Sequence, residues 1–166
     1  MKKIKVLDSK RLYVKKTRNG SGLFVSWQVE KGKLILKVLG TPFSVKDEKK
    51  FNEKIIANSF RFDEKTYINP SDEPADFINH SCSPNCSIVK IDNKLYLLSL
   101  RKILPDSEIL IDYSTIMAKD DNWKMKCNCG SKNCRIIISK FDTLPPKLQK
   151  KYLEIGIVPR HIINVN

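Results

Sequence analysis

The sequence contains no apolar stretch long enough to cross a membrane. Its longest apolar runs, at residues 34–36 and 136–138, fall far short of the roughly 20 residues that a spanning helix needs. The basic start at residues 1–5 resembles the opening of a signal peptide, but the polar residues at 7–11 interrupt any apolar continuation. Internal repeats and a Gly-x-Gly-x-x-Gly motif are also missing, so nothing supports a Rossmann-type nucleotide site. We therefore expect an intracellular protein, in the cytoplasm or in the nucleus or nucleoid, with no membrane partner.

Acidic residues are scarce relative to basic ones. Lysine and arginine number 31 against 18 aspartates and glutamates, which gives a net charge of +13. Such a balance is typical of proteins that bind nucleic acid, but the basic residues are mostly lysines spread along the chain, as on any solvated surface. Charge alone specifies no partner, so nucleic acid stays open as one. A basic substrate would be repelled unless acidic residues line its groove.

The hydrophobic pattern predicts one domain that is mostly β with small helices. Apolar residues make up 41% of the chain, enough for a true core. Short β-prone runs fill residues 1–40 and recur at 88–91, 95–100 and 109–113, separated by Gly-, Asn- and Pro-containing turns. The regular strand–helix alternation of a doubly wound sheet is missing.

Two helices are expected outside these strands. Ser44 is a candidate cap for a helix over residues 45–58, in which Phe51, Ile55 and Ile56 would form a narrow apolar face. A second helix would start at Leu144-Pro145-Pro146 and stop at Gly156, with Leu148, Tyr152 and Leu153 on one face.

The five cysteines point to a metal rather than to disulfides, because their number is odd and no leader is expected. Three of them form a tight Cys-x-Cys-x4-Cys knuckle, in which Gly130 lets the backbone curl: Cys127, Cys129 and Cys134. A structural zinc ion takes four ligands in a tetrahedron, so one more must come from elsewhere. Cys82 and Cys86 are both candidates. The alternative, three inert buried thiols, fits poorly with so polar a segment.

Four motifs, taken in order, carry a resemblance. They are Asn19-Gly20-Ser21-Gly22, the stretch Phe-Ile-Asn-His-Ser-Cys-Ser-Pro-Asn-Cys at 77–86, Glu-Ile-Leu-Ile-Asp-Tyr at 108–113, and the cysteine knuckle. Together they resemble the SET-domain family of protein lysine methyltransferases with its Cys-rich post-SET segment, over about residues 10–140. The resemblance implies a β-clip-like fold of short sheets with a knot-like crossing. It further implies a catalytic domain at 1–120 with a variable insert at 45–63, a post-SET zinc segment at 121–140, and a C-terminal helix and tail at 141–166 packing on the domain.

The resemblance also implies roles for individual residues. The cofactor would be S-adenosylmethionine, contacted by Asn19, Gly20, Ser21, Gly22, Asn79, His80, Tyr113 and Asn128. Tyr113 matches the catalytic tyrosine. One structural zinc ion would be held by Cys82, Cys127, Cys129 and Cys134, which leaves Cys86 as a small core residue. The implied reaction moves a methyl group onto a lysine of another protein, with chromosomal or histone-like proteins among the candidate substrates.

Other interpretations remain for the same residues. Taken singly, Asn79 could be a turn residue, His80 a structural histidine and Tyr113 a core residue. A cysteine-protease pair of His80 and Cys82 lacks an orienting third group. The main alternative is a catalytically silent SET-like module that binds protein or nucleic acid.

Three positions depart from the family pattern. Val38-Leu39-Gly40-Thr41 stands where the family often has Tyr-x-Gly-Glu, so a channel tyrosine is missing or is replaced from elsewhere, for example by Tyr67. Asp76 replaces the usual Arg before Phe-Ile-Asn-His. Ile111 stands where Phe or Tyr is common, and this smaller side chain suggests room for more than one methyl group.

Overall fold

The computed structural model describes residues 6–7 and 9–164, so the basic start at 1–5 lies outside the described residues. Short strands dominate the described chain: β1 (Leu12–Thr17), β2 (Gly20–Val25), β3 (Leu34–Lys37), β4 (Thr41–Ser44), β5 (Phe60–Arg61), β6 (Thr66–Asn69), β7 (Asn79–His80), β8 (Cys86–Ile91), β9 (Lys94–Ser99), β10 (Ser107–Glu108), β11 (Leu110–Ile111), β12 (Met125–Lys126) and β13 (Ile137–Ile138). The helices are also short: η1 (Ser9–Arg11), η2 (Val45–Lys50), α1 (Glu53–Ala57), η3 (Pro74–Phe77), η4 (Tyr113–Ile116), η5 (Phe141–Thr143), α2 (Pro146–Glu154) and α3 (Arg160–Ile163). The prediction of a mostly β fold with small helices is confirmed.

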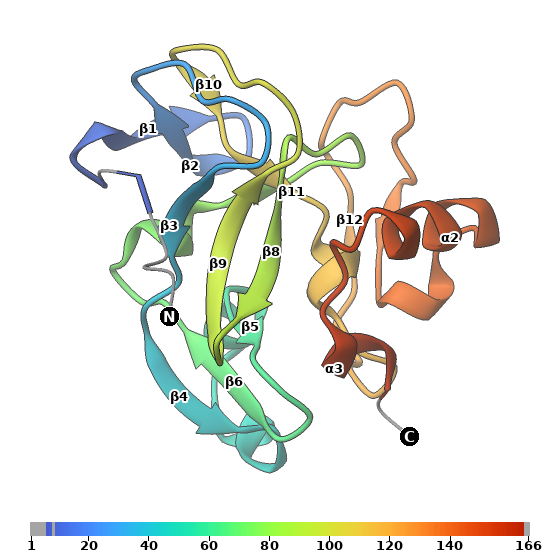
Figure 1. Cartoon of the computed structure of the whole chain (residues 1–166). Coiled ribbons are helices and arrows are strands. Elements are labelled where there is room, and N and C mark those ends of the chain that lie inside the picture. Colours follow the sequence, from blue (N-terminus) through green and yellow to red (C-terminus); the bar gives the residue numbers. More distant parts are fainter. Residues whose placement is uncertain (1–5, 8, 165–166) are drawn as a thin grey trace.

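The strands form several small sheets rather than one large one (Figure 1). Three of these sheets have three strands each, in the orders β1-β2-β10, β3-β9-β8 and β4-β6-β5. The other two are pairs, antiparallel β12-β13 and parallel β11-β7. The parallel pair brings Leu110 opposite Asn79 and Ile111 opposite His80, so two motifs some thirty positions apart in sequence become neighbours.

The main core is built by alternation along the β8–β9 hairpin. Cys86 and Ile88 lie fully buried on one face of β8, and Leu95 and Leu97 face the same core from β9. Residues two apart share a face of a strand, so the period-two apolar pattern places these side chains together. Cys86 is therefore a core residue, as predicted.

The predicted helix over 45–58 is wrong as a single element. Ser44 does cap a helix, because its side chain accepts from the Lys46 N–H, but that helix is the 3₁₀ segment η2. The chain becomes extended at Phe51, and Asn52 then caps α1 by accepting from the Ile55 N–H. A second capping side chain within the segment starts a new helix instead of continuing the first.

The predicted strand at 109–113 is also shorter than expected. Pairing stops after Ile111, because the Asp112 side chain accepts from the Ser114 N–H and starts η4. In α2 the predicted start at Pro146 is confirmed, and Gly156 follows the helix with a φ of 68° that suits glycine. Leu153, however, is 43% exposed and does not share the buried position of Tyr152.

The C-terminal segment packs on the rest of the chain through a second, smaller core. Phe141, Leu144, Tyr152 and Ile157 cluster there with Ala118. Polar contacts add to this packing: the Ser87 hydroxyl donates to the Ile157 carbonyl at 3.1 Å, and the His161 ring meets the Arg61 carbonyl at 3.0 Å. Figure 1 shows α2 and α3 beside the β8 side of the central hairpin. Within the described part of the chain, no helix is both long and apolar enough to traverse a membrane.

Candidate active site and metal centre

Two cavities meet beside Tyr113. The first, with about 580 Å³ of empty space, lies between the segment 56–60, the loop after β6 and the segment 116–123. The second, with about 790 Å³, lies between the β1–β2 turn, β7 and the cysteine knuckle. Four residues line both cavities, so the cavities are neighbours along a shared boundary, called the junction below: Ala57, Asn58, Tyr113 and Trp123.

The second cavity gathers most of the residues predicted to bind the cofactor. Asn19, Asn79, His80, Tyr113 and Asn128 all line it. The Asn128 side-chain amide donates to the Asn19 side chain at 3.1 Å, which joins the β1–β2 turn to the knuckle across 109 positions of sequence. The cavity is thus lined by amides and aromatic rings, as expected for a site that orients a ligand with a few polar groups.

The glycine loop supports this cavity rather than lining it. Gly20, Ser21 and Gly22 lie beside it in β2, and the Asn79 amide donates to the Ser21 carbonyl at 3.0 Å. Gly22 permits the close approach, since a Cβ there would lie 2.4 Å from Glu108 Oε1 and 3.1 Å from Asn79 Nδ2. A side chain at this position would push Glu108 away from the Asn79 amide, which donates to Glu108 Oε1 at 2.8 Å.

Tyr113 is held with its hydroxyl group already committed. The hydroxyl donates to the Ile78 carbonyl at 2.7 Å, and the Tyr113 backbone N–H donates to His80 Nδ1 at 3.1 Å. Burial, with Glu108 and Asp76 nearby, raises the pKa of the Tyr113 hydroxyl above its ordinary value, so the group stays protonated at neutral pH. Because its hydrogen is used on Ile78, the hydroxyl can offer a ligand only an acceptor lone pair.

The first cavity has an acidic lining in an otherwise basic protein. Glu48, Asp76 and Asp121 all border it, next to apolar side chains such as Ile56. Burial raises the pKa of Glu48 and of Asp121, and each is further raised by neighbouring carboxylates. Asp121 is already paired with Arg61, but Glu48 and Asp76 form no ion pair with another described residue, so these two favour a cationic ligand.

The Tyr67 suggested as a channel tyrosine does border the first cavity, but its hydroxyl is occupied. It donates to Asp121 Oδ1, and Asp121 also accepts from Arg61 at 2.6 Å. Arg61 is itself fully buried and bonded to Asp120 at 3.0 Å. Tyr67 therefore shapes the wall and fixes Asp121.

Cysteines from both ends of the predicted metal site come together. The sulfurs of Cys82, Cys127 and Cys129 and a ring nitrogen of His80 all lie within 4.8 Å of one another. Cys134 packs against the same cluster but is not one of these mutually close groups. Thiolate and imidazole are the ligands that zinc prefers in structural sites, so the donor set fits that ion.

The surroundings of the thiols shift their pKa values in different directions. Burial opposes ionisation of Cys129, but donors from the backbone at Cys82 and Ser131 prevail and lower the pKa of the Cys129 thiol to about 6. Burial instead raises the pKa of Cys82 and of Cys127. A metal ion binds cysteine as the thiolate. The positive charge of the bound ion would therefore have to stabilise the thiolates of Cys82 and Cys127.

The orientation of His80 favours Cys134 over His80 as fourth ligand. Burial lowers the pKa of His80 to about 4, so the ring is neutral at physiological pH. Nδ1 accepts the Tyr113 N–H, which puts the ring hydrogen on Nε2, 3.3 Å from Cys82 Sγ. An Nε2 that carries hydrogen donates to the sulfur and has no lone pair for a metal. The set of four cysteines therefore stays a prediction, in which His80 would bond a ligand sulfur.

Comparison with known proteins agrees with this geometry. A family model for the SET domain matches residues 20–114, more than half of the chain. The chain belongs to the SET domain family. The histone-lysine N-methyltransferase of Saccharomyces cerevisiae that is specific for H3 lysine-4 is 32% identical over 126 residues, which cover 69% of this chain and 12% of the relative.

Other relatives give the same result. Histone-lysine N-methyltransferase trr of Drosophila melanogaster is 32% identical over 146 residues, 81% of this chain and 6% of the relative. Human histone-lysine N-methyltransferase 2B is 31% identical over 128 residues, 70% of this chain and 5% of the relative. The chain therefore spans only a small part of these relatives. The SET match itself ends at Ser114, before the cysteine knuckle.

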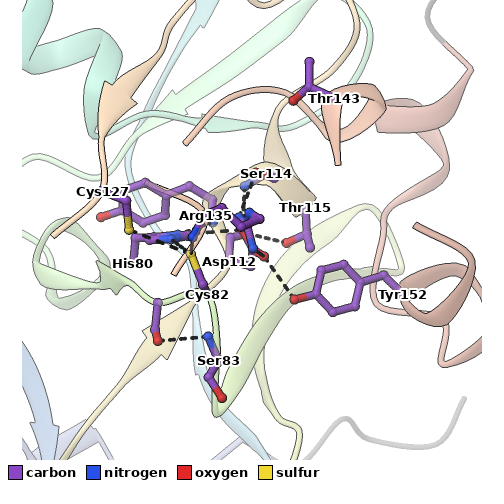
Figure 2. Close-up of polar contacts among 12 residues, drawn as sticks. His80, Cys82, Ser83, Asp112, Ser114, Thr115, Cys127, Arg135, Thr143 and Tyr152 are labelled. Atoms are coloured by element: carbon purple, nitrogen blue, oxygen red, sulfur yellow. Dashed lines mark hydrogen bonds and ion pairs between the residues drawn. The ribbon is translucent and has the colours of Figure 1, made fainter. Parts of the chain in front are cut away.

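A buried carboxylate ties the SET domain to the segments that follow it, and sequence reasoning missed its role. Figure 2 shows Asp112 between Arg135 and Tyr152. The two terminal guanidinium nitrogens of Arg135, Nη1 and Nη2, donate to its carboxylate at 2.7 and 2.6 Å, and the Tyr152 hydroxyl donates to it at 3.0 Å. The Arg135 backbone N–H also donates to Cys82 Sγ at 3.4 Å. Asp112, next to Tyr113 in sequence, thus joins the knuckle and α2 to the site.

The structure places Ile111 away from both cavities of the SET domain. Its side chain is fully buried in the main core and is not among the described residues that line either cavity. The suggestion that the small side chain at this position leaves room for more than one methyl group stays a prediction.

Proposed function

We propose that this protein is an S-adenosylmethionine-dependent protein-lysine N-methyltransferase that acts inside the cell on a histone-like protein. The single observation that carries the proposal is the meeting of two cavities at Tyr113, one bordered by amides and the other by carboxylates. Two reactants that enter from different sides would meet at that junction. The relatives named above are histone-lysine methyltransferases, which supports the same reaction class.

The second cavity suits the cofactor in its lining of amides and aromatic rings. Asn19, Asn79, His80 and Asn128 would hold it, and Gly22 keeps Asn79 in position. S-adenosylmethionine, when bound, supplies a methyl group that its sulfonium has already activated. What remains for the protein is to align the substrate amine and to exclude water.

The first cavity suits a lysine side chain in its lining. Glu48 and Asp76 attract its positive charge, which answers the repulsion expected from the net charge of +13. The nucleophile must be the neutral amine, and at an unperturbed pKa near 10.4 only roughly one lysine in two thousand is neutral at pH 7. Ala57 and Trp123 give the junction an apolar boundary, where desolvation lowers the lysine pKa. Tyr113, with a lone pair to offer, would orient that amine.

A zinc ion held by Cys82, Cys127, Cys129 and Cys134 would have a structural part. It would fasten the knuckle, and with it Asn128, over the cofactor cavity. We accordingly divide the chain into a catalytic domain at 1–120, a zinc segment at 121–140 and a tail at 141–166. Zinc adds folding free energy because a short loop of this kind has little core of its own.

Methyl transfer can be tested directly. The protein is incubated with methyl-labelled S-adenosylmethionine and core histones, and the modified residues are identified by mass spectrometry. We expect label on lysine, and Tyr113→Phe should lower turnover about 100-fold through misalignment while the affinity for the cofactor changes little. Cofactor binding without any transfer to histones would contradict the proposal and favour a silent binding module.

A further inference from the structure

The junction between the two cavities presents two hydrogen-bonding side chains besides the Trp123 indole. Of the residues that line both cavities, Ala57 offers only a methyl group, which leaves Asn58 and Tyr113 as polar groups that could accept a hydrogen bond. Asn58 lies at the end of α1, in the variable insert, and was not singled out by its sequence. During methyl transfer the substrate lysine would occupy the first cavity and the cofactor the second. A side chain at the junction can therefore contact the reacting nitrogen.

The orientation of the Asn58 amide is determined by Asp76. Asn58 Nδ2 donates to Asp76 Oδ1 at 3.0 Å. A carboxylate only accepts, so the NH₂ end of the amide must face Asp76 and the carbonyl end must face away. Among the described residues no donor is bonded to Asn58 Oδ1. Every buried polar side-chain atom of these residues has a hydrogen-bond partner, so this unpaired oxygen is not buried. It is therefore accessible and can accept from a ligand, on a side chain that lines both cavities.

Asn58 and Tyr113 then present the same kind of group. The Tyr113 hydroxyl has given its hydrogen to the Ile78 carbonyl, so it too offers only lone pairs. A primary amine has two hydrogens and one lone pair. Two acceptors on one side of the junction can take both hydrogens and leave the lone pair directed at the methyl donor. A monomethylated lysine has one hydrogen left to donate, and a dimethylated lysine has none.

We propose that Asn58, oriented by Asp76, is a specificity residue that accepts an N–H of the substrate amine and favours unmethylated lysine over methylated lysine. This inference rests on the proposed function and adds a preference in the number of methyl groups. Asp76 acts as a positioning residue, because it touches the amide and need not touch the substrate. The preference comes from hydrogen bonds that are lost as methyl groups accumulate, with no change in the size of the cavity.

The test compares single-turnover rates on three peptides of the histone H3 tail, with lysine 4 unmethylated, monomethylated or dimethylated. Asn58→Leu keeps a similar volume and removes the acceptor. Asp76→Asn lets the amide turn its NH₂ group towards the substrate. Ser59→Ala is the matched control, since Ser59 borders only the first cavity and its hydroxyl bonds the Ile55 carbonyl at 2.6 Å.

We expect Asn58→Leu to lower the ratio of the unmethylated to the dimethylated rate about tenfold, as for one lost hydrogen bond. Asp76→Asn should lower the ratio in the same direction, which keeps the test valid if Asn58→Leu folds poorly. Ser59→Ala should leave the ratio unchanged. Equal losses on all three peptides in Asn58→Leu and Asp76→Asn would show a merely structural role and overturn the inference. Failure of the unaltered protein to methylate core histones would instead overturn the proposed function on which it rests.

Discussion

Replacing Tyr152 by phenylalanine tests whether the C-terminal helix stabilises the site. The tyrosine is buried at 4% exposure, and its hydroxyl donates to the carboxylate of Asp112, which is only 1% exposed. Phenylalanine keeps the ring and its packing and removes only that donor. A hydrogen bond to a charged group contributes about 1.5–3 kcal/mol, more than one between neutral partners.

The expected loss in free energy of unfolding is therefore about 1.5–3 kcal/mol. For a domain of this size each kcal/mol lowers the melting temperature by about 2–4 °C, so Tyr152→Phe should melt about 3–12 °C lower. Urea unfolding followed by circular dichroism, at a fixed excess of zinc, measures the change. The metal must be held constant because any ligand of the folded state adds to the apparent stability.

Tyr96→Phe provides the matched control. Tyr96 is buried to the same 4% exposure, but its hydroxyl makes no hydrogen bond to another described residue. This variant should unfold within about 0.5 kcal/mol of the unaltered protein. If Tyr152→Phe is no less stable than Tyr96→Phe, then Arg135 alone satisfies Asp112 and the helix does not support the site.

Three further outcomes follow from the geometry. Removal of metal with a chelator should destabilise the protein, on the order of 5 kcal/mol, and a melting temperature that does not respond to chelator would contradict the cysteine site. Gly22→Ala should weaken S-adenosylmethionine binding by about tenfold in calorimetry, because the new Cβ would lie 2.4 Å from Glu108 Oε1, which accepts from the Asn79 amide at 2.8 Å, and would disturb that pair; unchanged affinity would count against that support. Burial lowers the pKa of His161 in the folded state, so the unfolded chain binds more protons and stability should fall as the pH drops below about 6.5. His161→Gln should flatten this fall in urea titrations at successive pH values, and an unaltered slope would refute the assignment.

Much of the site could be predicted because its parts are local motifs. Asn79 and His80 form β7, which pairs in parallel with β11, the strand that ends directly before Asp112 and Tyr113. Two motifs that are far apart in sequence therefore lie side by side. Cys82 and Cys127 likewise lie with their sulfurs 3.8 Å apart. Cysteines that cluster in a polar segment have few functions other than metal binding, so the sequence alone indicates this site.

Apart from one local break, the parts that were missed depend on contacts between distant elements. In the segment 45–58 the break at Phe51 was missed because Asn52, a second capping side chain after Ser44, was read as part of one helix although it starts α1. Arg135 is one of many basic residues in the sequence and directly follows Cys134. Its partner Asp112 lies 23 positions away, and a single sequence carries no signal that joins them. Asp76 was noticed as a departure, but its function in orienting Asn58 requires coordinates.

The contacts of Arg135 make the metal centre and the tyrosine parts of one unit. Its backbone N–H donates to Cys82 Sγ while its guanidinium holds Asp112, whose neighbour Tyr113 gives its own N–H to His80. His80 in turn lies 3.3 Å from the same Cys82 sulfur, so the path returns to its starting atom. Because such a ring of bonds is shared by both sites, loss of the metal must loosen the backbone that carries Tyr113 as well as the knuckle. Metal depletion should therefore lower turnover even when S-adenosylmethionine is saturating, which a zinc ion that only closed the cofactor cavity would not cause.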